Sequence, residues 1–240
     1  MLQARSAKNL PNLVCPHVVS QGGHYFANLL FSTTGQFAEL AYSAVPIQFL
    51  IENHATLSQQ HYPLENYDGL RECIVVDSFR GKFADLPAYV AFRPTTKQLV
   101  VSICGTSSLK HALHDLRAMR VEHPSRRGGV HAGFWDLYQG IKDMLFSGIR
   151  KGIDEHSPAE LVLTGHSMGG SIAYLLCMDY LADKDNWKAS LSVKLAVFGA
   201  PRTGDAGLVD YFRCLTETFR QNSGEHSFYE YSVKGYNDGA

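Results

Sequence analysis

The chain has 240 residues, of which 45% are hydrophobic and 19% are charged, and its formal net charge is −1. These values are typical of a globular domain with a sizeable core, and the balanced charge argues against a nucleic-acid partner. No apolar run approaches the roughly 18 residues that a membrane-spanning helix needs, so we expect no transmembrane segment.

Residues 1–22 contain basic side chains but no apolar block after them, so they do not read as a signal peptide. We expect residues 1–23 to be an N-terminal extension and residues 24–240 to form one domain. The localisation stays open between the cytoplasm and a truncated or mature form of a secreted protein.

Periodic and unbroken apolar runs predict a series of helices and strands. The first part of the domain is expected to contain a helix over residues 24–52, broken near Pro46, and a polar irregular segment over 53–70. Strands are predicted over 71–76, 88–92, 98–104, 160–164, 193–198 and 228–233. Helices are predicted over 131–151, 167–181 and 206–221. Strand and helix alternate from residue 160 on, which predicts a parallel sheet with helices on its faces. A hairpin with its turn at residues 93–97 makes the sheet mixed, so the expected fold class is α/β with a mostly parallel sheet.

Five cysteines at irregular spacing indicate neither a disulfide framework nor a zinc site. Cys104 ends a strand-like run and Cys177 lies in a helix-like run. We expect both to be buried free thiols.

A Gly-x-Ser-x-Gly pattern joins the predicted strand over 160–164 to the helix that follows it. The pattern consists of Gly165, His166, Ser167, Met168 and Gly169. A serine hydroxyl is a poor nucleophile, and a tight strand-to-helix turn lifts it clear of the backbone towards a base. The two glycines leave room for the strand and helix to approach closely. The alternative is a glycine-rich turn with an incidental serine, but the flanking strand and helix favour Ser167 as a nucleophile.

An oxyanion hole is expected where the strand over 98–104 ends. The backbone N–H groups of Thr106 and Met168 are the candidate donors, because such donors come from a loop after a strand and from the residue after the nucleophile. A helix N-cap at Ser107 or Ser108 is a compatible interpretation of the same loop. Residues 107–115 next to it form either a lid that moves at a lipid surface or a plain surface helix.

Four motifs, in order, resemble those of the class 3 lipases, the fungal triacylglycerol lipase type with the α/β-hydrolase fold. They are Val100–Ser108, Val130–Phe134, Leu163–Gly170 and Phe198–Gly204. The resemblance covers about residues 24–240. It implies a Ser–Asp–His triad and hydrolysis of acylglycerols or related lipid esters, without a metal or cofactor, and with transient contact to a lipid surface.

The resemblance places the triad acid in the pair Asn237-Asp238, after the last predicted strand. From the residues alone, Asp238 suits this role because it sits just past a strand end. Asp205 and Asp210 compete with it, although Asp205 lies at a predicted helix start, where aspartate is a common cap. We favour Asp238.

The triad histidine is expected after the acid, yet only Gly239 and Ala240 follow Asp238. Eleven histidines are present, and none occupies the position that the resemblance requires. His166 should point away from the serine hydroxyl, and His54, His123 and others lie in segments that we expect to be loops or peripheral. We therefore expect a chain that is incomplete at its C-terminus and that turns over esters very slowly.

Two classes of function stay open. One is a serine ester hydrolase, within which lipase, phospholipase A1, feruloyl esterase and thioesterase are not separated by fold and triad. The other is a catalytically inactive α/β-hydrolase-like module that binds lipid or a partner.

Overall fold

The structure, a computed structural model, describes residues 33–83, 85–105, 119–188 and 190–233. Its centre is a six-stranded sheet with the order β1-β2-β3-β6-β7-β8. The strands are β1 (Ile74–Arg80), β2 (Pro87–Arg93), β3 (Gln98–Ile103), β6 (Glu160–His166), β7 (Ser192–Phe198) and β8 (Phe228–Val233). The first three strands pair antiparallel, and β3, β6, β7 and β8 pair in parallel. The predicted mixed, mostly parallel sheet is confirmed.

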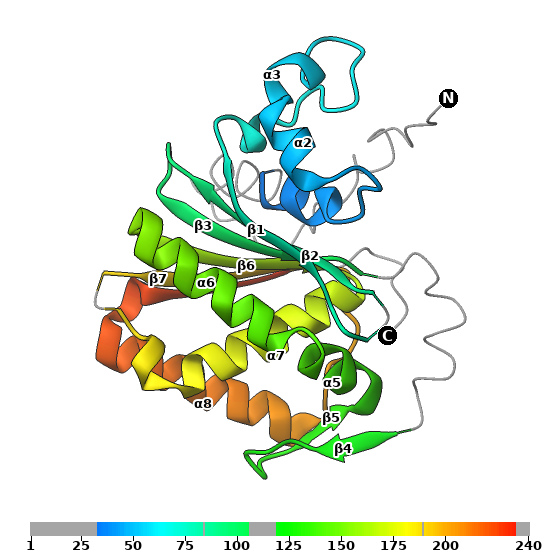
Figure 1. Cartoon of the computed structure of the whole chain (residues 1–240). Helices are drawn as coiled ribbons and strands as arrows, with labels where there is room; N and C mark the ends of the chain where they lie inside the picture. The colour runs from blue at the N-terminus through cyan, green and yellow to red at the C-terminus, as the bar shows by residue number, and fades with distance from the viewer. Residues whose placement is uncertain (1–32, 84, 106–118, 189, 234–240) are drawn as a thin grey trace, which may run out of the picture.

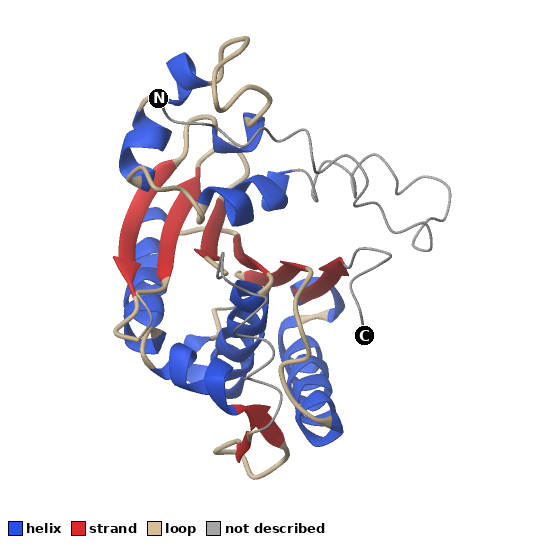
Figure 2. Ribbon diagram, turned by 90° about the vertical axis from the view of Figure 1, so that its right-hand side faces the viewer, coloured by secondary structure: helices blue, strands red, loops and turns tan. Residues whose placement is uncertain are grey.

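The longer helices pack beneath the sheet, and short helices lie above it (Figures 1 and 2). The longer ones are α5 (Ala132–Gln139), α6 (Lys142–His156), α7 (Met168–Ala182) and α8 (Ala206–Ser223), and the short ones are the helical residues 33–40, α2 (Ile47–Glu52) and α3 (His54–Leu57). A two-stranded ribbon of β4 (Arg120–Glu122) and β5 (Gly129–His131) lies on the side of the longer helices, next to α5 (Figure 1). Three 3-10 turns complete the described elements: η2 (Asp68–Leu70), η3 (Lys184–Asn186) and η4 (Glu225–Ser227).

The core follows from unbroken apolar strands and a helix that is apolar on all sides. The central residues of β6 and β7 are almost fully buried, as expected of parallel strands covered on both faces. Helix α7 buries twelve of its fifteen residues, because it lies between the sheet and its neighbouring helices α5 and α8. The Gly-x-Ser-x-Gly pattern therefore stands where the buried strand β6 meets the buried helix α7.

The prediction of one continuous helix over 131–151 is wrong. The helix is interrupted at Gly140, between α5 and α6, and the Gly140 carbonyl accepts a hydrogen bond from the Lys82 backbone N–H at 3.1 Å. A Cβ on Gly140 would lie 2.5 Å from the Phe83 ring, so a side chain at this position would force that ring to move. The periodicity of the apolar residues continues through the break and does not reveal it.

Two further expectations are corrected by local turns. The strand expected from residue 71 begins at Ile74, because Glu72 has φ +58° and the Cys73 N–H donates to the Leu70 carbonyl. The segment over 53–70, expected to be irregular and polar, contains α3 and η2 and buries His54 at 5% exposure. Of the helix predicted over 24–52, the described part is helical over 33–40 and again in α2, with Pro46 as the N-cap of α2.

Among the helices of the described ranges, none combines the length and apolar character that crossing a membrane requires.

Candidate active site

Ser167 occupies the turn between β6 and α7. Its backbone has φ +57° and ψ −126°, a conformation that costs a non-glycine residue about 1–3 kcal/mol and persists only where the surroundings impose it. Here the Ser167 N–H donates to the Phe198 carbonyl at 2.7 Å, and its own carbonyl accepts from the Gly170 N–H at 2.9 Å. The predicted strained strand-to-helix turn is confirmed; the role of Ser167 as a nucleophile stays a prediction.

The two glycines of the pattern allow α7 to approach the sheet. A Cβ on Gly165 would lie 2.5 Å from the carbonyl carbon and oxygen of Gly169. A Cβ on Gly169 would overlap the Ile103 carbonyl oxygen at the end of β3. Side chains at these positions would push the nucleophile turn away from the neighbouring strand, which explains why the pattern requires glycine there.

The Ser167 hydroxyl is buried and uncommitted. The residue is 4% exposed, and within the described part of the chain its Oγ has no hydrogen-bond partner. Leaving a buried hydroxyl unsatisfied costs about 1–3 kcal/mol, so the group needs an explanation, and a role in chemistry is one that also fits the strained turn.

Met168 is the first residue of α7, so its backbone N–H lies at a helix N-terminus where negative charge is stabilised. The other candidate oxyanion donor, Thr106, lies outside the described residues, as do the candidate lid over 107–115 and Asp238. The chain leading to Thr106 is nevertheless well placed. Ile103 pairs with Gly165 in parallel register, and a Cβ on Gly105 would lie 2.6 Å from the His166 carbonyl oxygen. The end of β3 therefore meets the nucleophile turn.

The two competing acids are engaged elsewhere. Asp205 caps α8, as its position predicted, and its carboxylate accepts from the backbone N–H groups of Leu208 at 3.0 Å and Gly129 at 2.9 Å. These two hydrogen bonds hold the pKa of Asp205 below its usual range. Asp210 forms an exposed ion pair with Arg213 at 2.9 Å. Neither arrangement leaves a carboxylate free to orient a histidine beside Ser167.

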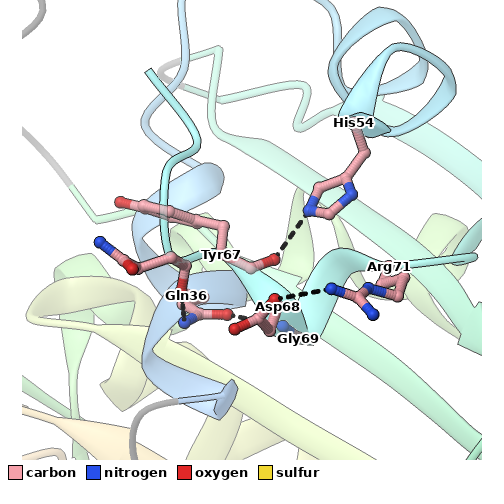
Figure 3. Close-up of polar contacts among 7 residues, drawn as sticks. Gln36, His54, Tyr67, Asp68, Gly69 and Arg71 are labelled. Atoms are coloured by element: carbon pink, nitrogen blue, oxygen red, sulfur yellow. Dashed lines mark hydrogen bonds and ion pairs between the residues drawn. The ribbon is translucent and has the colours of Figure 1, made fainter. Parts of the chain in front are cut away.

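No histidine of the described ranges is hydrogen-bonded to Ser167 Oγ. His166 is exposed, and its Nδ1 lies 2.9 Å from the Tyr42 hydroxyl. Two of the histidines expected in loops or peripheral segments are buried. His54 is buried, and its Nε2 lies 2.9 Å from the Tyr67 carbonyl oxygen (Figure 3). His123 is 4% exposed and contacts Trp135 edge to face, with ring centroids 5.2 Å apart.

The cysteine expectations are confirmed. Cys104 and Cys177 are both buried and free. Burial raises the pKa of the Cys104 thiol to about 11, so it is a packing residue of the β3 end and no nucleophile.

Comparison with known proteins agrees with this geometry. A family model described as "Lipase (class 3)" matches residues 100–228, which include the end of β3, the nucleophile turn and helix α8. The Rhizomucor miehei lipase is 27% identical over 145 residues, which are 60% of this chain and 40% of that protein. The secreted mono- and diacylglycerol lipase A of Penicillium camembertii is 27% identical over 138 residues, 57% of this chain and 43% of that protein. The chain thus spans less than half the length of these relatives.

Solved structures show the same fold. Lipase II from Rhizopus niveus superposes with a TM-score of 0.65 at 19% identity, over 87% of this chain and 72% of that chain. The Rhizomucor miehei lipase propeptide complex superposes with a TM-score of 0.64 at 22% identity, over 80% of this chain and 58% of that chain. The α/β-hydrolase fold expected from the motifs is confirmed.

Proposed function

The chain belongs to the class 3 lipase family, and from that premise we propose that it is a serine hydrolase that cleaves the carboxylic ester bonds of acylglycerols or related lipids through an acyl-enzyme on Ser167. The observation that carries this proposal is the buried hydroxyl of Ser167, which has no hydrogen-bond partner among the described residues, on a strained turn between β6 and α7. Strain of this kind clusters at functional sites, and it persists only where the surrounding structure imposes it.

The proposed reaction has two halves. Ser167 Oγ attacks the ester carbonyl carbon while its proton passes to a base. The negative charge on the carbonyl oxygen is stabilised by the backbone N–H groups of Met168 and Thr106, and each such donor typically contributes about 3 kcal/mol in the transition state. The alcohol leaves with the proton that the base took from Ser167. Water then gives a proton to the same base and attacks the acyl group, which leaves as a carboxylic acid while Ser167 regains its proton. The proposal assigns the triad acid to Asp238.

The mono- and diacylglycerol lipase among the relatives supports a lipid ester as substrate for this chain. The fold and the nucleophile alone do not determine which acyl chain and which alcohol the substrate carries. The contrasting function, an inactive lipid-binding module, would keep the fold without needing a strained serine.

Trapping the acyl-enzyme tests the proposal without requiring turnover. The chain is incubated with p-nitrophenyl butyrate, quenched in acid, and its intact mass and tryptic peptides are measured. We expect one butyryl group per chain, on Ser167, and none on the Ser167→Ala variant. A chain that binds lipid micelles but carries no acyl group would favour the inactive module.

A further inference from the structure

The Tyr42 hydroxyl lies where three segments distant in sequence meet. It lies 2.9 Å from His166 Nδ1 and 3.3 Å from the His166 carbonyl oxygen, so it contacts the residue directly before Ser167. A Cβ on Gly105 would overlap this hydroxyl, which places the end of β3 against it as well. A single side chain outside the four motifs thus contacts both the nucleophile turn and the end of β3, which leads to the candidate oxyanion loop.

The segment that carries Tyr42 is fixed from two directions. The Phe37 carbonyl accepts hydrogen bonds from the hydroxyls of Tyr89 at 2.7 Å and Ser102 at 2.8 Å, which tie the helical residues 33–40 to β2 and β3. The Gln36 amide accepts from the Gly69 N–H and donates to the Asn66 carbonyl, each at 2.9 Å, which ties the same helix to the loop before β1 (Figure 3). Tyr42 is therefore held in place from the sheet, independently of the nucleophile turn.

The bond between Tyr42 and His166 forms in either neutral state of the imidazole. With the ring proton on Nε2, the hydroxyl donates to Nδ1 at 2.9 Å. With the proton on Nδ1, the ring donates to the Tyr42 oxygen, and the hydroxyl is free to donate to the His166 carbonyl at 3.3 Å. Burial, reinforced by Cys104 and opposed by the Gly105 backbone, raises the pKa of Tyr42, so the hydroxyl keeps its proton.

We propose that Tyr42 is a positioning residue that holds the nucleophile turn against the end of β3, so that Ser167 Oγ and the oxyanion donors keep their spacing. This inference rests on the proposed role of Ser167. The physical reason is that the strained turn must be held by its surroundings, and the Tyr42 hydroxyl is a side-chain contact that reaches the turn from outside the β6–α7 unit. Small misplacements of a nucleophile are costly, because about 1 Å can reduce a rate by about 100-fold.

The test compares Tyr42→Phe with a matched control, Tyr180→Phe. Tyr180 lies in α7, the helix that follows the nucleophile turn, and like Tyr42 its hydroxyl reaches a backbone carbonyl, that of Asn186, at 2.9 Å. For wild type and both variants, the second-order rate constant of labelling by a fluorophosphonate and the Tm are measured on the full chain. We expect Tyr42→Phe to slow labelling of Ser167 about tenfold, equivalent to about 1.4 kcal/mol of activation free energy. Tyr180→Phe should lower the Tm by a similar amount to Tyr42→Phe and change labelling by less than about twofold.

Equal labelling rates for wild type and Tyr42→Phe would overturn the positioning role while leaving Ser167 as the nucleophile. A wild-type chain that labels at another residue would overturn the proposed function, and this inference with it. The half-saturating concentration of p-nitrophenyl butyrate for acylation should stay unchanged in Tyr42→Phe, since the hydroxyl acts on the turn and not on substrate binding. A change in that concentration without a change in the labelling rate would also refute the positioning role.

A second variant tests the shared contact through a double-mutant cycle. Gly105→Ala introduces a methyl group that overlaps the Tyr42 hydroxyl, so it should slow labelling more in the wild-type background than in Tyr42→Phe. Rate effects that simply multiply would show that the two residues act separately and would contradict the shared contact.

Discussion

Substituting Gly169 by alanine adds only one methyl group but should strongly disrupt the nucleophile turn. The added methyl group would overlap the Ile103 carbonyl oxygen and lie 2.8 Å from the carbonyl carbon and oxygen of Cys104. All of these atoms are backbone at the end of β3, which is hydrogen-bonded to β2 on one side and β6 on the other and cannot yield locally. Overpacking of this kind typically costs about 1–3 kcal/mol, and the rigid surroundings place Gly169→Ala at the upper end.

For a chain of this size, a loss of about 3 kcal/mol corresponds to a fall in Tm of about 6–12 °C. Thermal unfolding followed by circular dichroism measures it, and fluorophosphonate labelling should fall in parallel because α7 moves away from β3. Gly35→Ala is the control: its methyl group would meet only the Phe198 ring at 3.7–3.8 Å, and it lies in a helix, so it should raise stability by about 0.5–1 kcal/mol. A Gly169→Ala variant that unfolds within about 2 °C of wild type would refute the steric account of the glycine pattern.

Two further predictions concern titratable groups. Backbone N–H groups of Leu208 and Gly129 lower the pKa of Asp205, so the stability its carboxylate contributes is complete above about pH 4, the unfolded value, and is lost as the pH falls through the folded pKa. The difference in Tm between wild type and Asp205→Asn should therefore shrink below about pH 4, and a constant difference down to about pH 2 would contradict this cap. Burial raises the pKa of Cys104 to about 11, so iodoacetamide at about pH 8 should alkylate the half-buried Cys214 well before Cys104 in the native protein. In urea the two cysteines should react at similar rates. Equal rates in the native protein would contradict the burial of Cys104.

The nucleophile turn could be predicted from sequence because its determinants are local. An apolar strand, two glycines around Ser167 and a helix of small and apolar residues lie within 23 consecutive positions, Glu160–Ala182. The parallel order of β3, β6 and β7 follows from unbroken apolar runs in the same way. The class 3 lipase resemblance is carried by these local motifs and is confirmed by the family match over residues 100–228.

The features that escaped prediction depend on contacts between distant residues. The break at Gly140 is fixed by Phe83 and Lys82, which no local pattern connects to it. The β4–β5 ribbon consists of two three-residue strands, too short for alternation to be visible. Tyr42 was expected only as part of a helix, and its contact with His166 spans 124 positions, so only the fold brings the two together.

The most direct test of the central claim is the site of covalent modification by a fluorophosphonate, mapped by tandem mass spectrometry on the native chain. The account predicts a single adduct on Ser167, absent from Ser167→Ala and from the wild type unfolded in urea, because reactivity depends on the strained turn. An adduct on another serine, such as Ser107, or equal labelling of Ser167 in the native and unfolded chain, would contradict it.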